Sequence, residues 1–372
     1  MRRGVLVAGF TLAAMVALPA AADASVTWST SFSGPSGYEV AGFAARSAVD
    51  VWAVGLRPGG RCQYRTLTQH WDGSAWTVVP SPSDTAVNSV LDGVTVAGTK
   101  QAWAVGTMGC PADQSRTLTE HWNGSRWSIV SSPNGGVPGN PFSTLQAVAA
   151  VSPANVWAVG AQAGIRNQAP VSVPLIEHWD GTNWSIVPVP QAALGVLESV
   201  SAASASDVWA VGGGQQSGQS TVALHFNGSS WQLVTAPTPP STTGGLSSVK
   251  ALSPTSAWAV GESFPAAGGS GKILTDHWNG TTWQVVTAPP VGGPTALSAL
   301  SAVGAAPTTG VWAVGSWVTG TAGNSVVLHW TGTAWQQEPA PSASDLFSVA
   351  VLPNNELFAA DQGTIFLGQP SG

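Results

Sequence analysis

The sequence predicts an all-β protein, a β-propeller of seven four-stranded antiparallel blades in which the N-terminal strand closes the last blade. Three observations predict this fold: a Trp-rich unit recurs about every 50 residues, turn residues divide each unit into four short strands, and the two chain ends carry complementary parts of a seventh unit. A fixed period of this size is typical of a propeller or a solenoid. Four short strands per unit, without helical periodicity, favour propeller blades.

The first marker of the unit is a strand that ends in Trp-Ala-Val-Gly. This strand is apolar on both faces, which suits a strand packed between neighbouring blades. A degenerate seventh copy, ELFAAD, places Phe358 where the other units have Trp. The six Trp residues of the motif, spaced 49 to 54 residues apart, are Trp52, Trp103, Trp157, Trp209, Trp258 and Trp312.

The second marker is His-Trp-Asp/Asn-Gly, followed three residues later by Trp. Asp-Gly and Asn-Gly favour turns with positive φ, so the motif predicts a hairpin between the third and fourth strands. Two units depart from it, with Phe226 in place of the first Trp and Thr331 in place of Asp or Asn. The turn residues, which we interpret as structural, are Asp72, Asn123, Asp180, Asn227 and Asn279.

Every histidine occupies one position of this second marker. Zinc would require several of these side chains to converge on one centre, whereas a ring of blades spreads them around its circumference. We therefore expect each His to hydrogen-bond between strands or blades, and we expect no metal site and no cofactor. The six residues are His70, His121, His178, His225, His277 and His329.

The chain ends predict how the ring closes. The C-terminal unit has a first strand at 346–351, a second at 356–361 and a third at 364–367, but it stops before the Trp-containing fourth strand. The segment 26–29, which contains Trp28, is similar to that fourth strand. An N-terminal strand that completes the last blade would remove the open edges of the ring.

The N-terminus has the pattern of a secretory signal peptide. Arg2 and Arg3 precede an apolar run at 4–18, and small residues end the segment at Ala24. The alternative is an uncleaved membrane anchor, but the run has 15 residues, fewer than the roughly 20 that a spanning helix needs. We expect a signal peptide at 1–24, a propeller domain at 25–372, and a secreted, extracellular protein without a membrane span after signal removal.

The composition limits the partners of the protein. Only 8% of the residues are charged and the net charge is −6, whereas phosphate binding needs clustered Lys and Arg. We therefore expect no nucleic-acid partner. We also expect a monomer.

The order VWAVG, variable loop, EHWNG and a Trp-containing strand resembles the kelch repeat. Trp-Asn or Trp-Asp stands where the kelch repeat has Tyr-Asp, and a single Gly mostly replaces the kelch Gly pair. The order is still more similar to the WAVG/HWNG-repeat secreted propellers of actinobacteria, which are mostly of undefined function. The resemblance covers nearly all of the chain after residue 24 and implies the fold. It implies no activity, because propellers serve as binding modules, oxidases and hydrolases alike.

Cys62 and Cys110 are the only cysteines, and they lie at equivalent positions in adjacent blades. In an exported protein such a pair favours a disulfide. The bond would close a loop of about 48 residues, which stabilises the fold by up to about 4 kcal/mol on a chain-entropy account. Two free thiols are the alternative.

Variable segments on one face are the best candidates for a ligand site. The loops between the second and third strands, together with the links between blades, vary in length and share that face, and ligand sites favour variable loops on a rigid scaffold. Aromatic and guanidinium groups there suit stacking on sugars or contact with a peptide. The candidate ligand-binding residues are Arg57, Arg61, Tyr64, Arg166, Phe264 and Trp317.

The first functional hypothesis is a secreted, non-catalytic binding or scaffold propeller that recognises an extracellular glycan or protein through this face. The alternative is a secreted glycan-active enzyme of glycosidase or oxidase type. A glycosidase needs two carboxylates about 5–10 Å apart, and the variable face offers only scattered acids. These are Asp84, Asp113, Glu262 and Asp345. We therefore expect no catalytic residues. The sequence does not separate the first hypothesis from a purely structural protein.

Overall fold

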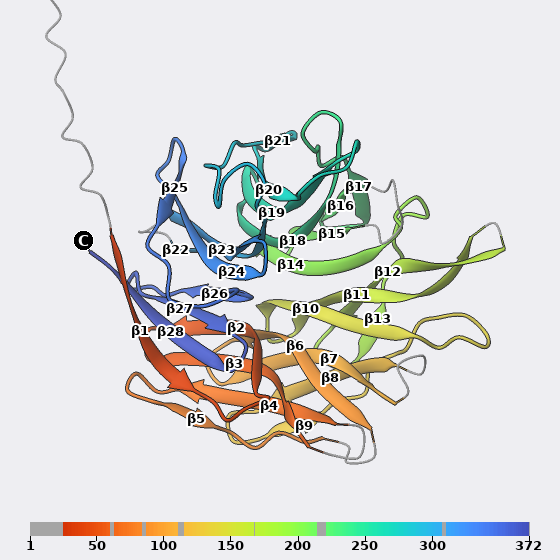
Figure 1. The fold of residues 1–372 in the computed structure, drawn as a ribbon. Coiled ribbons are helices and arrows are strands. Elements are labelled where there is room, and N and C mark those ends of the chain that lie inside the picture. The colour runs from red at the N-terminus through yellow and green to blue at the C-terminus, as the bar shows by residue number, and fades with distance from the viewer. Residues whose placement is uncertain are drawn as a thin grey trace, which may run out of the picture.

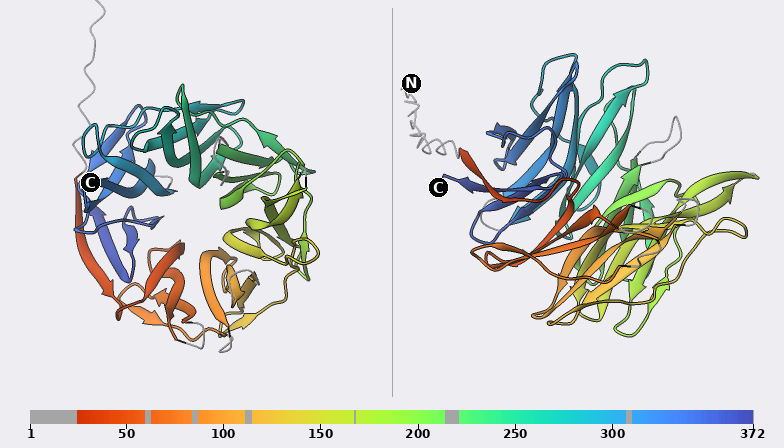
Figure 2. Two further views of the ribbon diagram at one scale, coloured as in Figure 1. Left: turned by 45° about the vertical axis from the view of Figure 1, so that its right-hand side comes forward. Right: turned by 60° about the horizontal axis from the view of Figure 1, so that its bottom comes forward.

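The computed structural model describes residues 25–59, 63–83, 87–110, 115–166, 168–213, 221–306 and 310–371. The regular structure in these ranges consists of seven antiparallel sheets of four strands each. Figure 2 shows them as blades around a central opening. The predicted seven-bladed propeller is therefore confirmed. The described ranges contain no helix long and apolar enough to cross a membrane.

Each blade runs from an innermost strand at the central channel to an outermost strand at the rim, and the blades are numbered 1 to 7 in chain order. The innermost strands are β2 (Glu39–Ser47), β6 (Asn88–Ala97), β10 (Ser143–Ser152), β14 (Val196–Ser204), β18 (Thr242–Ser253), β22 (Leu297–Ala306) and β26 (Ser348–Val351). The second strands are β3 (Asp50–Pro58), β7 (Gln101–Gly109), β11 (Asn155–Arg166), β15 (Asp207–Gly213), β19 (Ser256–Pro265), β23 (Gly310–Thr319) and β27 (Leu357–Asp361). The third strands are β4 (Tyr64–Trp71), β8 (Arg116–Trp122), β12 (Ala169–Trp179), β16 (Thr221–Phe226), β20 (Lys272–Trp278), β24 (Ala322–Trp330) and β28 (Thr364–Pro370). The outermost strands are β5 (Trp76–Val78), β9 (Trp127–Ile129), β13 (Trp184–Ile186), β17 (Trp231–Val234), β21 (Trp283–Val285), β25 (Trp335–Glu338) and β1 (Val26–Ser33).

The N-terminal strand closes the ring, as the sequence predicts. β1 pairs antiparallel with β28, and Trp28 lies opposite Gly368 in that pair. The indole Nε1 of Trp28 also donates a 2.7 Å hydrogen bond to the carbonyl of Pro339, which follows blade 6. Figure 1 shows β1 beside the C-terminal strands. The last blade therefore has its fourth strand, and that strand contacts the preceding blade as well.

Tryptophan rings fill the wedges between neighbouring blades. The ring of Trp52 in blade 1 is only 2% exposed, and it packs against Trp122 and Trp127 of blade 2 at centroid distances of 4.9 and 5.1 Å. Equivalent aromatic triplets recur between later pairs of blades. Aromatic pairs at such distances add about 0.5–1.5 kcal/mol each beyond the burial of their area. The Trp-rich repeat is thus the hydrophobic core of the protein.

Hydroxyl side chains connect the innermost strands of adjacent blades. Ser201 of blade 4 accepts a 3.0 Å hydrogen bond from the backbone N–H of Ala251 in blade 5, and Thr95 of blade 2 accepts one from Ala150 in blade 3. An innermost strand is the edge of its sheet, so the N–H groups on its open side need partners from outside the sheet. These Ser and Thr side chains supply them.

The glycine that ends the Trp-Ala-Val-Gly motif permits a β-bulge in the innermost strand. A Cβ at Gly106 would lie 2.1 Å from the carbonyl oxygen of Val90 on β6, so only glycine fits this close approach. Opposite Gly106, the pairing of β6 with β7 shifts between Leu91 and Gly93 and leaves Asp92 as the extra residue. A bulge re-aims the side chain of its extra residue. The motif therefore controls which side chain of the innermost strand faces the channel.

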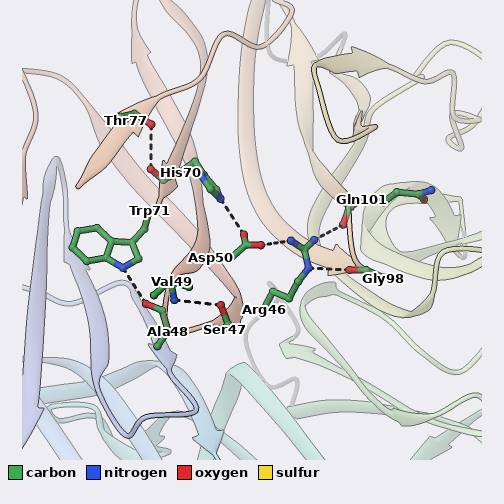
Figure 3. A network of polar contacts seen from close by, with 10 residues as sticks. All are labelled: Arg46, Ser47, Ala48, Val49, Asp50, His70, Trp71, Thr77, Gly98 and Gln101. Atoms are coloured by element: carbon green, nitrogen blue, oxygen red, sulfur yellow. Dashed lines mark hydrogen bonds and ion pairs between the residues drawn. The ribbon is translucent and has the colours of Figure 1, made fainter. Parts of the chain in front are cut away.

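A polar network on the face of the short turns joins blades 1 and 2 (Figure 3). The Nε2 of His70 lies 3.0 Å from Oδ1 of Asp50, and the other oxygen of Asp50 forms an ion pair with Arg46. Arg46 in turn donates hydrogen bonds to the carbonyls of Gly98 and Gln101 in blade 2. This histidine therefore anchors a contact between blades.

The other histidines repeat the contact within their own blades. Four of them hydrogen-bond the first residue of the second strand, and these are His121, His178, His225 and His277. Blade 6 has Gly310 at that position, and its His329 instead lies 4.0 Å from a carboxylate oxygen of Glu338. The predicted structural role of the histidines, hydrogen bonding between strands, is confirmed in blades 1 to 5.

The Asp/Asn-Gly motif forms the turn between the third and fourth strands. Oδ1 of Asp72 accepts hydrogen bonds from the backbone N–H groups of Ser74 and Ala75, and Gly73 has a φ of +97°. The hydrogen bonds from Ser74 and Ala75 lower the pKa of Asp72 to about 2. The same side-chain contacts recur in blades 2 to 5. These polar residues are therefore structural, as the sequence predicts.

Candidate functional site

The predicted ligand-binding residues that the structure describes lie on the variable face, in four different blades. They occupy the ends of second strands or the start of a third strand, and none of them lines the central channel. Arg61 and Cys62 lie outside the described residues, so the disulfide between Cys62 and Cys110 stays a prediction. The five described residues are Arg57 and Tyr64 in blade 1, Arg166 in blade 3, Phe264 in blade 5 and Trp317 in blade 6.

Two of these residues are held by nearby backbone. The guanidinium Nε of Arg57 donates a 3.1 Å hydrogen bond to the carbonyl of Thr66 across its own hairpin. Arg166 donates to the carbonyl of Gln191 at 3.4 Å. Both side chains therefore have local structural contacts in addition to their place on the variable face.

Trp317 packs against the link between blades 5 and 6. Its ring lies so close to the backbone of Gly292 that a Cβ there would be 2.3 Å from a ring carbon, and the indole joins the hydrophobic cluster between these blades. Tyr64 and Phe264 are more open, at 37% and 36% exposure. The three aromatic members, Tyr64, Phe264 and Trp317, belong to three separate sheets and do not form one aromatic platform.

A ring of bulge residues forms a different site at the same face. Each of the first six innermost strands has a register shift at the same position of the repeat, and one extra residue lies at each shift. In blade 7, Phe347 has the equivalent place, because its backbone N–H bonds the carbonyl of Ala360 just before β26 begins. All seven residues line the channel, and they are Ala41, Asp92, Gln146, Glu198, Ser247, Ser301 and Phe347.

The channel encloses about 500 Å³, and its mouth on the variable face forms a further cavity of about 430 Å³. Glu39 and Leu56 contribute to this mouth from the start of β2 and the end of β3. These are the strand ends next to the variable loops, which places the bulge ring just inside the variable face. Phe347 exposes 42% of its surface there.

The charged groups of the ring have no partners within the described part of the chain. Asp92 and Glu198 form no hydrogen bond or ion pair with another described residue, and the same holds for Lys250, which lines the channel further inside. Along β18, Lys250 lies three residues beyond the ring position, a distance of about 10 Å in a β-strand. The channel therefore has an acidic ring near one mouth and a lysine beyond it.

Burial shifts the pKa value of each of these three groups in the direction that favours its neutral form. Loss of solvation and then repulsion by Glu198 raise the pKa of Asp92 to about 7. Loss of solvation also raises the pKa of Glu198 and lowers the pKa of Lys250. Glu198 is exposed to the channel, but protein surrounds the channel and replaces much of the bulk water. Perturbed acids in a cavity are a recognised mark of a functional site.

The sequence prediction does not include this ring, because the ring lies within strands and the predicted residues lie in or beside loops. A signal was present within the strands: each ring residue directly follows an apolar residue, Val40 or one of six leucines, at the same place in the repeat. The apolar residue is constant in character, whereas the next residue is Ala, Asp, Gln, Glu, Ser or Phe. Variation at one position of an otherwise regular strand indicates a side chain that the core does not constrain.

No protein-family model matches the chain, and no curated protein matches it either. Among solved structures, the chain is similar to YCF48 bound to D1 peptide, with 17% identity, a TM-score of 0.58 and coverage of 96% of this chain and 100% of that one. It is also similar to YCF48 from Cyanidioschyzon merolae, with 16% identity, a TM-score of 0.57 and coverage of 91% and 98%. The WD40 β-propeller domain of Doa1 matches with 10% identity, a TM-score of 0.54 and coverage of 92% and 97%. The chain is therefore a β-propeller of the same general architecture, and identities this low indicate the fold alone.

Proposed function

We propose that this protein is a secreted, non-catalytic binding propeller that recognises a protein partner through its variable face, with the mouth of the central channel at the centre of the site. The observation that carries the proposal is the cavity of about 430 Å³ at that mouth, where unpaired acids and an exposed phenyl ring converge. Ligand sites combine a concave, partly apolar surface with a few placed polar groups. Secretion is proposed from the N-terminal pattern of the sequence.

A protein partner is favoured over a glycan by the arrangement of aromatic side chains. Sugar binding would use stacked aromatic rings, but Tyr64, Phe264 and Trp317 lie in separate blades, and Trp317 covers Gly292. The similar propeller YCF48, whose structure is described as bound to a D1 peptide, provides an example of peptide recognition by this fold.

The test is a comparison of two ligand collections on the purified protein. A library of random displayed peptides and a glycan array are each incubated with the chain, and retained ligands are remeasured individually by calorimetry. We expect peptides to be retained and to compete with one another for one site. Retention of glycans alone, or of no peptide at all, would contradict the proposed function.

A second candidate function, a glycan-active enzyme, is supported by one observation. Asp92 and Glu198 face the same channel, and the pKa of Asp92, raised to about 7, suits a general acid at neutral pH. This pair was absent from the acids considered from sequence, of which Asp84 and Asp113 lie outside the described residues. Release of reducing sugar from a polysaccharide by the natural chain, but not by Asp92→Asn, would favour the enzyme over the binding module.

A further inference from the structure

The acidic ring residues lie in a cavity whose described lining residues include no lysine or arginine to pair with them. Asp92 and Glu198 come from blades 2 and 4, with Gln146 of blade 3 between them, and the two carboxylates repel each other. An ionised carboxylate away from bulk water is costly unless it is paired. The fold holds both in place through β-bulges that depend on glycine in the second strand, so the arrangement is built into the repeat.

The shape of the site favours an organic cation over a metal ion. Calcium takes six to eight oxygen ligands at 2.3–2.6 Å, and no group of three His, Cys, Asp or Glu residues within the described ranges could hold a metal. The mouth is instead a cavity of about 430 Å³, large enough for a side chain. Its exposed Phe347 adds an aromatic surface, which attracts ammonium and guanidinium groups through its π-face.

The lysine of the channel limits how far a positive ligand enters. Lys250 lies on β18, about 10 Å beyond the ring in strand rise. A positively charged ligand is attracted to Asp92 and Glu198 and is repelled by the protonated form of Lys250. The stable position is therefore at the ring, with the rest of the partner on the variable face.

We propose that the ring formed by Asp92, Gln146, Glu198 and Phe347 is a binding site for an alkylammonium or guanidinium group, supplied by a Lys or Arg side chain of the protein partner. The two carboxylates pair with the cation, the amide of Gln146 accepts one of its hydrogen bonds, and the phenyl ring of Phe347 contacts its apolar stem. This inference rests on the proposed function and specifies the chemistry that the channel mouth recognises.

Proton release distinguishes this pairing from simple contact. The charged groups that line the channel and its mouth are Glu39, Asp92, Glu198 and Lys250. Of these, Asp92 has a pKa of about 7, so a cation that requires its ionised form displaces a proton when it binds near neutral pH. The affinity then rises about tenfold between pH 6 and pH 8 and is nearly constant above that, by the linkage between proton and ligand binding.

The experiment starts from displayed peptides that the purified chain retains. Each peptide is synthesised again with norleucine in place of Lys or citrulline in place of Arg, and binding is measured by calorimetry in two buffers of different ionisation enthalpy. We expect the neutral peptides to bind at least about tenfold more weakly, as for loss of a desolvated charge pair. The unmodified peptides should release about half a proton each when they bind at pH 7. In parallel, n-pentylammonium and spermidine are used as competitors. Displacement of the peptide by either at equal concentration would assign the cation to a free amine, and failure to displace it assigns the cation to a side chain.

Two variants of the acidic ring and one control variant test whether the ring determines peptide affinity. Asp92→Asn and Glu198→Gln keep size and should each weaken binding by about fivefold or more, with Asp92→Asn also abolishing the rise with pH. Glu356→Gln removes one carboxylate at the β26–β27 turn, outside the channel, and should change the affinity less than about twofold. Far-UV circular dichroism and thermal unfolding confirm that each variant is folded.

The outcomes separate the two proposals. If peptides bind but are insensitive to the loss of their Lys or Arg and to Asp92→Asn, the cation site is wrong and the protein-binding function stands. If no peptide is retained, the proposed function itself fails. If Glu356→Gln weakens binding as much as Asp92→Asn, the attraction comes from overall negative charge, and the ring has no specific role.

Discussion

Replacement of a single buried carboxyl in the core, Glu120→Gln, should make the stability of the protein less sensitive to pH. Glu120 lies on β8, two residues from Leu118, which packs between blades 1 and 2. Its exposure is 0%, and neither of its carboxyl oxygens has a hydrogen-bond partner among the described residues. Loss of solvation raises its pKa from 4.5 to about 8. The folded protein therefore holds Glu120 as a neutral acid at pH 7.

The sign and size of the effect follow from the two pKa values. Below about pH 4.5 the group is protonated in both states and has no effect on the pH dependence. Between about pH 4.5 and pH 8 only the unfolded chain releases the proton, so the free energy of unfolding falls as the pH rises. The difference between a pKa of 4.5 and a folded-state pKa of about 8 lowers the free energy of unfolding by about 5 kcal/mol above pH 8. About 3 kcal/mol of this decrease has occurred by pH 7.

The chain provides its own controls at this repeat position. Blade 1 has the buried amide Gln69, and blades 4 and 6 have Leu224 and Leu328. Glu120→Gln imitates blade 1 and removes the titration, whereas Gln69→Glu adds a further buried acid to the fold. We expect the first variant to flatten the dependence of stability on pH and the second to steepen it.

Urea unfolding of the three proteins at pH 4.5, 6, 7 and 8.5 measures the difference directly. The natural chain and Glu120→Gln should have similar stability at pH 4.5 and should diverge by about 3–5 kcal/mol at pH 8.5, with the variant more stable. Parallel curves over this range would refute the reasoning, because they would mean that Glu120 ionises equally well in the folded state.

Three further substitutions and one control test the packing. Gly106→Ala should destabilise the fold by about 2–3 kcal/mol in urea unfolding, because its Cβ would lie 2.1 Å from the carbonyl of Val90. The control Gly245→Ala, whose Cβ would have its nearest contact 3.8 Å away, should cost less than about 0.5 kcal/mol. An equal cost for both variants would argue against the role of Gly106 in the bulge. Ser201→Ala should cost about 1–3 kcal/mol by leaving the N–H of Ala251 unpaired, and an unchanged melting temperature would contradict this. Trp317→Ala should lower stability by about 1–3 kcal/mol, because the indole is only partly buried. Peptide affinity, measured by calorimetry, should stay within about twofold, and a large loss of affinity with unchanged stability would return Trp317 to the binding site.

The sequence predicts the fold well because every repeat unit has the same packing and turn requirements. A closed ring buries the Trp of each second strand between blades. It also forms the Asp/Asn-Gly turns and pairs the two chain ends in one sheet. Even the strand that contains Trp28 is identified from its similarity to the outgoing strands of the other blades. The histidine contact with the first residue of the second strand is predictable in blades 1 to 5 for the same reason, because each histidine has the same place in the repeat.

The candidate site is harder to predict because it depends on side-chain direction. Asp92 and Glu198 are 106 residues apart in the chain, and only closure of the ring brings their strands around one channel. Whether each side chain faces the channel or a neighbouring blade depends on a one-residue bulge, since a shift of one residue reverses the face of a strand. The aromatic and guanidinium residues of the loops are easier to notice, but their blades hold them apart.

Hydrogen exchange of the protein with and without a retained peptide tests the central claim, that the channel mouth on the variable face is the binding site. The account predicts slower exchange in the segments 88–93 and 196–199, where the innermost strands of blades 2 and 4 begin. The segments around the short turns, such as 46–50 with the network of Arg46 and Asp50, should be unchanged. Protection at those short turns, with none at the channel mouth, would contradict the account.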